Sequence, residues 1–220
     1  MNKSDIDFNR LIDIKYVLSK LSKTRQIFVS EADFQLELAW VIKTIYPNAI
    51  VRLEYCPYFD LNMHIDILVI MNNKWYPIEL KYKTKGCTKV VDDEIFNLKN
   101  HGAKDVNSYL YLKDIMRIEK VRNNINNFGN GYTMFITNDL SYMKKPLKDN
   151  CVYSEFSLED RIVKKGKMFW SKNASKGTMK NCEEPIILNN SYNINWKCYS
   201  KLDNENTGTF IYVINEIKNN

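Results

Sequence analysis

The sequence predicts an α/β fold in which a helix, three strands, a second helix and a fourth strand precede a β-rich region. Residues 30–46 repeat apolar side chains at helical spacing. Residues 64–71 and 75–83 read as two strands joined by a turn at Asn72 and Asn73. At 220 residues the chain is long enough for one sizeable core.

The N-terminal part of the chain shows two helical patterns. Apolar side chains recur at roughly helical spacing over residues 7–21, which predicts a first helix. Ser30 is a predicted N-cap, with Asp33 in the place of the usual glutamate of a capping box. The helix that it begins, which is the first helix of the core, is predicted to end at Tyr46. A strand over residues 49–56 follows it.

The pattern of helices and strands is less clear in the rest of the chain. The hairpin is predicted to close near Gly86, and residues 93–121 read as a helix interrupted at His101 and Gly102. Residues 132–137 form a short apolar strand, and weaker strand candidates lie at 152–156, 168–170, 186–188 and 209–217. We expect an N-terminal helical extension over 1–29, a core over 30–140 and a β-rich elaboration over 141–220 that packs on the same domain.

Composition excludes several kinds of site. The five cysteines are odd in number and widely spaced, and only His64 and His101 are available as imidazole ligands, so a disulfide scaffold or a zinc site is not expected. Any metal should be a hard cation on oxygen ligands, with Mg²⁺ as the default. No apolar run approaches the roughly 20 residues that span a membrane, and the first residues do not resemble a signal peptide, so we expect a cytoplasmic protein.

The predicted hairpin brings two carboxylates together. If Asn72 and Asn73 form a two-residue turn, Asp66 lies directly opposite Glu79, and Lys81 shares their face because side chains alternate along a strand. Facing carboxylates repel, and a divalent cation between them is the simplest explanation. The alternative is a solvated polar face with a cross-strand salt bridge, and a different loop length would place Asp66 on the other face.

The chain contains three acid-x-Lys triplets, so the motif needs its context. Besides Glu79-Leu80-Lys81 they are Asp13-Ile14-Lys15, in a helical pattern, and Glu216-Ile217-Lys218, at the end of a predicted strand. Only the triplet at Glu79 has an aspartate facing it across a hairpin. That triplet is therefore the candidate for chemistry.

These residues resemble the PD-(D/E)xK, or restriction-endonuclease-like, nuclease superfamily. The resemblance rests on Asp66, on Glu79-Leu80-Lys81 and on the element order, and it covers a little over half of the chain, with Ile65 where the family pattern has proline. It implies an αβββαβ core with a mixed central sheet flanked by helices. It also implies that Glu31 is a further carboxylate of the site, with Glu37 as the second choice.

The resemblance implies a set of roles. Asp66, Glu79, Lys81 and Glu31 would be catalytic. The ligands of Mg²⁺, for which Mn²⁺ can substitute, would be Asp66, Glu79, the backbone carbonyl of Leu80 and Glu31. Lys81 would position or help deprotonate the attacking water and bind the phosphate.

Several residues are candidates for contact with nucleic acid. Residues 161–180 hold seven basic side chains and no acid, which exceeds the whole net charge of +6. The alternative is an exposed lysine-rich loop whose aromatic side chains enter the core. The mixed charges of residues 93–121 indicate an ordinary solvated face. The candidate contacts are Lys83, Lys85, His64, Gln35, Lys164, Lys165, Lys167 and Trp170.

The function expected from these features is a Mg²⁺-dependent nuclease, and the resemblance favours a DNA endonuclease of restriction, defence or repair type. A homodimer that makes paired cuts is left open. One alternative is a catalytically inert protein that binds nucleic acid with a nuclease-like fold. A second is a structural protein in which the motif is accidental, which would require Asp66 and Glu79 to face opposite sides of the sheet.

Overall fold

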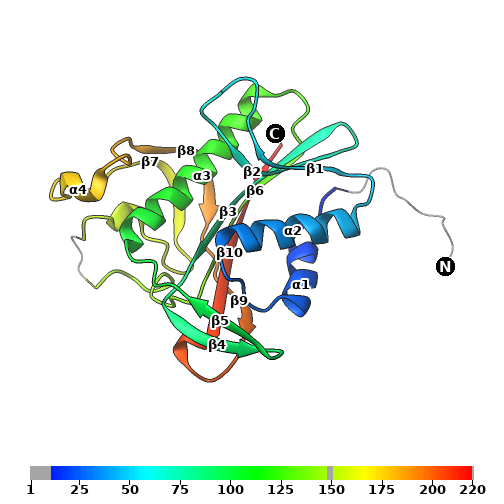
Figure 1. Cartoon of the computed structure of the whole chain (residues 1–220). Coiled ribbons are helices and arrows are strands. Elements are labelled where there is room, and N and C mark those ends of the chain that lie inside the picture. Colours follow the sequence, from blue (N-terminus) through cyan, green and yellow to red (C-terminus); the bar gives the residue numbers. More distant parts are fainter. Residues whose placement is uncertain (1–10, 148–150, 220) are drawn as a thin grey trace.

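The centre of the molecule is a mixed sheet of six strands in the order β1-β2-β3-β6-β10-β9 (Figure 1). The computed structural model describes residues 11–147 and 151–219. Strands β3 and β6 are parallel, and every other neighbouring pair in this sheet is antiparallel. The strands are β1 (Ile50–Tyr55), β2 (Ile65–Met71), β3 (Lys74–Lys83), β6 (Asn130–Thr137), β9 (Lys197–Lys201) and β10 (Thr209–Lys218). The predicted α/β class with a mixed central sheet is confirmed.

Helices cover both faces of this sheet. Helices α1 (Ile14–Thr24) and α2 (Glu31–Ile45) pack on one face, and α3 (Lys104–Asn124) packs on the other (Figure 1). Each face has its own apolar cluster, with Phe34 on the α2 side and Ile115 on the α3 side. Within the described residues, no helix is long and apolar enough to cross a membrane.

The two N-terminal helices begin at side-chain caps. The Ser30 hydroxyl accepts a hydrogen bond from the Asp33 amide at 3.1 Å, as predicted, so α2 begins at Glu31. The first helix begins later than its apolar spacing suggested, because the Asp13 carboxylate accepts from the Tyr16 amide and caps α1 there. Residues 7–10 of that predicted helix lie outside the described residues.

The hairpin between β2 and β3 has the predicted register. Ile67 pairs with Ile78 and Met71 with Lys74, so the two-residue turn is formed by Asn72 and Asn73. Both asparagines have positive φ, 52° and 59°, as a type I′ turn requires. This register puts Asp66 and Glu79 next in line on the two strands.

We expect Asn73→Gly to raise the free energy of unfolding, by up to about 1 kcal/mol, because glycine adopts positive φ without a Cβ clash. Asn73→Ala should lower it, since alanine lacks the tolerance of asparagine for this conformation. Thermal unfolding of both variants checks the turn. Equal stability of the glycine and alanine variants would contradict it.

The prediction of a helix from residue 93 is wrong. Residues before Lys104 form a separate hairpin of β4 (Cys87–Val91) and β5 (Glu94–Leu98). Its turn consists of Asp92 and Asp93, which have φ of 49° and 64°. The sequence carried this signal as two acidic turn residues between β-branched and aromatic runs.

The C-terminal third supplies two strands of the central sheet and also forms a separate hairpin outside it. Strand β10 pairs through Ile211–Lys218 with the whole length of β6, and β9, which was not predicted, pairs with the start of β10. Strands β7 (Val163–Met168) and β8 (Ile186–Asn193) form a hairpin beside α3, and α4 (Lys176–Met179) lies between them in sequence. The strand predicted at 152–156 is wrong, since Ser154–Phe156 is a 3₁₀ turn; a second 3₁₀ turn spans Asn206–Gly208.

Candidate functional site

The candidate site lies where β2 and β3 stop pairing. Their ladder ends at Ile67 and Ile78, and the β3 amides beyond it bond to carboxylates. The Leu80 amide donates to Asp66 Oδ2 at 2.6 Å, and the Tyr82 amide donates to Glu31 Oε2 at 2.7 Å. Beyond Ile78, the carboxylates of Asp66 and Glu31 therefore accept the β3 amide hydrogen bonds that a paired strand would accept. These bonds fix both side chains beside β3.

Gln35 holds the backbone of Asp66 in place. Its side-chain nitrogen donates to the Asp66 carbonyl at 2.7 Å and to Glu54 Oε1 at 2.6 Å. Gln35 lies one turn after Glu31 on α2. The first turns of α2 thus contact both strands of the site, and Gln35 acts through Asp66.

Glu79 is a buried carboxylate that accepts no hydrogen bond. Its side chain is fully buried, and Arg117 approaches Glu79 Oε1 to 3.1 Å without forming a hydrogen bond. Neither carboxylate oxygen has a hydrogen-bond partner. Burial raises the pKa of Glu79 well above its usual value; Asp114 and Asp66 add to the effect, and Arg117 opposes it.

Lys81 is paired with an acid that the sequence did not suggest. Its ammonium lies 2.7 Å from Asp114 Oδ2 and donates to the Leu80 carbonyl at 3.2 Å. Burial acts to lower the pKa of Lys81, but Asp114, with Glu31 and Asp66, outweighs burial and the pKa is raised. Lys81 is therefore an ammonium at neutral pH, which suits binding an anion rather than removing a proton.

Asp66 is also disfavoured as an anion. Burial raises its pKa to about 6, and Asp114 and Glu31 add to that rise. The hydrogen bond from Leu80 and the charge of Lys81 act in the opposite direction. A carboxyl group with this pKa changes charge just below neutral pH.

Sequence reasoning missed the contribution of α3. Asp114 is buried, and Arg117 contacts Glu79, Asp114 Oδ1 at 3.4 Å and the His64 carbonyl. The interpretation of this helix as an ordinary solvated face is wrong at these positions. Asp114 lies within the apolar stripe that contains Tyr111, and an acid inside such a stripe was the available signal.

Lys83 and Lys85, two of the predicted nucleic-acid contacts, both form ion pairs within the chain. Lys83 pairs with Glu31 at 2.9 Å, and Lys85 pairs with Asp139 at 3.2 Å. The side chain of His64 is exposed at the start of β2. Glu37, the second choice for the helix carboxylate, faces Arg25 at 3.4 Å and does not join the site.

The basic segment divides between core and surface. Lys164 is buried, its ammonium donates to the Glu155 carbonyl at 2.7 Å, and burial lowers its pKa to about 8. The Trp170 ring stacks on Tyr109 and its indole nitrogen bonds a backbone carbonyl, so Trp170 is a packing residue. Lys165 and Lys167 are exposed, as a nucleic-acid contact requires.

The residues present partly fit the hard cation that the sequence implies. Over residues 11–147 and 151–219, no three His, Cys, Asp or Glu side chains are grouped as metal ligands. Asp66, Glu79 and the Leu80 carbonyl nevertheless offer oxygen donors of the kind that Mg²⁺ prefers. The buried Glu79 oxygens, which lack hydrogen-bond partners, are the observation that favours a cation there.

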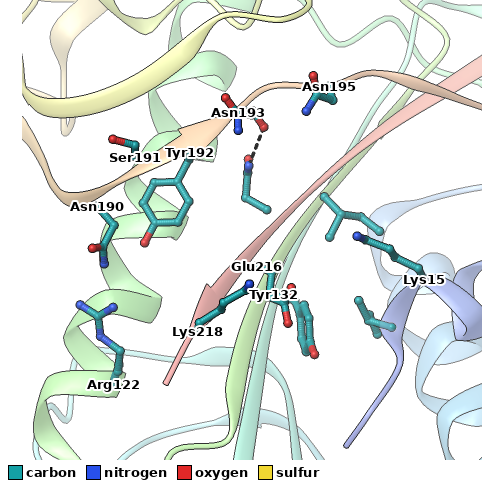
Figure 2. Close-up of a pocket in the computed structure, with 13 residues that line it drawn as sticks. Lys15, Arg122, Tyr132, Asn190, Ser191, Tyr192, Asn193, Asn195, Glu216 and Lys218 are labelled. Atoms are coloured by element: carbon teal, nitrogen blue, oxygen red, sulfur yellow. Dashed lines mark hydrogen bonds between the residues drawn. The ribbon is translucent and has the colours of Figure 1, made fainter. Parts of the chain in front are cut away.

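A polar pocket of about 530 Å³ lies apart from these residues (Figure 2). Lys15 approaches it from α1, Arg122 from α3 and Lys218 from the end of β10. Its lining includes none of the residues that the sequence predicted for the site. The pocket is therefore separate from the cluster around Glu79.

Comparison of the chain with protein-family models, curated proteins and solved structures finds no match. The functional interpretation therefore rests on the geometry and chemistry of the chain's own residues. Asp66, Glu79, Lys81 and Arg117 all have raised pKa values and lie together in one cluster, which is a feature typical of functional sites.

Proposed function

We propose that this protein is a Mg²⁺-dependent nuclease that hydrolyses phosphodiester bonds, with a restriction-endonuclease-like core and DNA as its substrate. The observation that carries the proposal is the cluster of Asp66, Glu79 and Lys81 at the point where β2 and β3 separate, with the Glu79 oxygens buried and without hydrogen-bond partners. The order α2, β1, β2, β3, α3, β6, interrupted only by the β4-β5 hairpin before α3, supports the same proposal.

The chemistry assigns a role to each side chain. A divalent cation held by Asp66, Glu79 and the Leu80 carbonyl would supply positive charge beside a substrate phosphate and a water molecule. Lys81, as an ammonium, binds a non-bridging phosphate oxygen and offsets charge that develops during hydrolysis. Glu31 fixes the direction of Lys83 and of the Tyr82 amide.

The test compares wild type with Glu79→Gln on plasmid, linear duplex, single-stranded DNA and RNA, each with Mg²⁺, Mn²⁺ or EDTA. We expect wild type to nick or linearise plasmid with either cation and not with EDTA. Glu79→Gln should lower the rate by about 10² to 10³-fold, since loss of one group that stabilises the transition state has effects of that order. Glu216→Gln, in the Glu-x-Lys triplet of β10, is the matched control, because Glu216 accepts from Asn130 and contacts none of the cluster residues, and it should cut like wild type.

Two results would refute the proposal. One is the absence of cleavage of all four substrates by wild type with both cations. The other is equal cleavage by wild type and Glu79→Gln, which would point to a contaminating nuclease. Cleavage of RNA or of linear ends alone would retain the nuclease and correct its substrate.

A second candidate is a protein of the same fold that binds nucleic acid without cutting it. The observation that favours it is the pairing of Lys81 with Asp114 and of Arg117 with Glu79, which offsets the buried charges within the chain itself. Retention of labelled DNA at low salt without cleavage would support this candidate. Its affinity should fall steeply as salt rises, because phosphate contacts release counterions.

A further inference from the structure

We propose that Arg117 is an internal counter-charge that competes with a divalent cation for Glu79 and withdraws toward Asp60 when the cation binds. This inference rests on the proposed function, because it assumes a cation at Asp66 and Glu79. It adds a regulatory step to that site, in which Arg117 neutralises the charge of the buried Glu79 carboxylate until a cation binds.

The contacts of Arg117 are those of a movable group. One terminal nitrogen lies 3.1 Å from Glu79 Oε1 and also bonds the His64 carbonyl, and the other lies 3.4 Å from Asp114 Oδ1. The Arg117 side chain is 26% exposed, whereas that of Glu79 is fully buried. The guanidinium therefore reaches inward from the surface and has an open path back.

A cavity beside Arg117 provides the second position. Its volume is about 360 Å³, and its lining includes Arg117, Asp60, Met63 and Lys120. Asp60 bonds Lys120 at 2.6 Å, and the charge of Arg117 helps to lower the pKa of Asp60. An acidic acceptor already within electrostatic reach of Arg117 makes the outward position favourable.

The balance of charge explains why the arginine would move. When all are ionised, the acids Asp66, Glu79 and Asp114 exceed the cations Lys81 and Arg117 by one charge. Binding of a divalent cation changes the net charge of the cluster from −1 to +1 while Arg117 stays in place. Withdrawal of Arg117 then brings the net charge to zero. Glu79 accepts no hydrogen bond from Arg117, so that contact is weakly directional, and withdrawal also exchanges the hydrogen bonds that Arg117 donates to the His64 carbonyl and to Asp114 Oδ1.

The test measures Mn²⁺ binding directly, by titration calorimetry on the full chain, together with the Tm at zero and saturating Mn²⁺. We expect Arg117→Gln to lower the Kd for Mn²⁺ about tenfold, since the competing charge is gone. The same variant should have a lower Tm than wild type without Mn²⁺ and should recover most of the difference with it. A purely structural arginine would lose the same Tm under both conditions.

Two further variants keep the inference testable if Arg117→Gln folds poorly. Asp60→Asn removes the outer acceptor, so it should raise the Kd for Mn²⁺ severalfold. Lys120→Gln removes the existing partner of Asp60 and leaves that carboxylate free for Arg117, so it should leave the Kd unchanged or lower it. The opposite effects of these two substitutions separate the acceptor from its ion pair.

The outcomes distinguish the inference from the function on which it rests. If wild type binds Mn²⁺ and Arg117→Gln binds it no more tightly, or Asp60→Asn binds it no more weakly, the inference is overturned while the nuclease proposal stands. If wild type and all variants fail to bind Mn²⁺, both are overturned. Tighter binding by Arg117→Gln with weaker binding by Asp60→Asn supports the inference.

Discussion

Asp66→Asn should stabilise the fold at pH 7.5, in the absence of divalent cations, while it removes the proposed nuclease activity. We expect the free energy of unfolding to rise by about 1 to 3 kcal/mol, because each unit of pKa shift corresponds to about 1.4 kcal/mol. Burial raises the pKa of Asp66 to about 6, so its charge is held at pH 7.5 where it is disfavoured. Asparagine keeps the oxygen that accepts from the Leu80 amide at 2.6 Å and has no charge.

The pH dependence of this effect has a definite sign. The folded pKa of Asp66, about 6, lies above the ordinary aspartate pKa of 3.8, so between these pH values the folded state binds the proton more tightly. The contribution of Asp66 to stability is therefore greatest below pH 3.8, and it is lost as pH rises to 6 and beyond. Urea denaturation should show a large gain for Asp66→Asn at pH 7.5 and almost none near pH 4.

Asp203 supplies a control of opposite sign. Its hydrogen bond with Lys89 lowers the pKa of Asp203, so its charge stabilises the fold at neutral pH. Asp203→Asn should therefore lower the stability at pH 7.5. A gain for Asp66→Asn that is the same at both pH values would contradict the electrostatic explanation.

Glu119→Ala should lower the free energy of unfolding by about 3 to 5 kcal/mol, because five hydrogen bonds to its carboxylate are lost and each contributes about 1 kcal/mol net. The Glu119 carboxylate is buried and accepts from the backbone and side-chain nitrogens of Asn189 and Asn190, at 2.8 to 3.4 Å, and from the Tyr192 hydroxyl at 2.7 Å. These bonds fasten β8 to α3. Urea denaturation measures the loss, and hydrogen exchange should show faster exchange in β8.

Tyr192→Phe is the matched control for Glu119. It removes one of these hydrogen bonds and keeps the ring, so the loss should be about 1 kcal/mol. A loss below about 1 kcal/mol for Glu119→Ala would mean that water replaces these contacts readily. Unchanged exchange in β8 would separate Glu119 from the anchoring of this strand.

The hairpin could be predicted because its determinants are local. A two-residue turn and strict alternation fix which side chains face each other, so the pairing of β2 with β3 followed from Asn72 and Asn73. The cap at Ser30 was equally local and placed Glu31 at the first turn of α2. The hairpin rule brought Asp66 and Glu79 together, whereas the position of Glu31 beside Tyr82, 51 residues away, was implied only by the resemblance.

The contribution of α3 could not be predicted in the same way. Asp114 and Arg117 reach Lys81 and Glu79 only because this helix packs across β3, a contact between segments more than 30 residues apart. The wrong start assigned to this helix also hid its apolar stripe. Mixed charges on a helix look alike in sequence whether they meet water or a buried acid.

The position of β10 has a consequence for how the protein is made. Strand β6, next to β3 of the site, pairs on its other side with β10, whose Phe210 and Val213 are buried. A growing chain that has emerged only as far as Thr137 therefore holds β2 and β3 in an incomplete sheet, in which β6 lacks its partner β10. We expect the candidate site to gain its full support only after β10 has been synthesised.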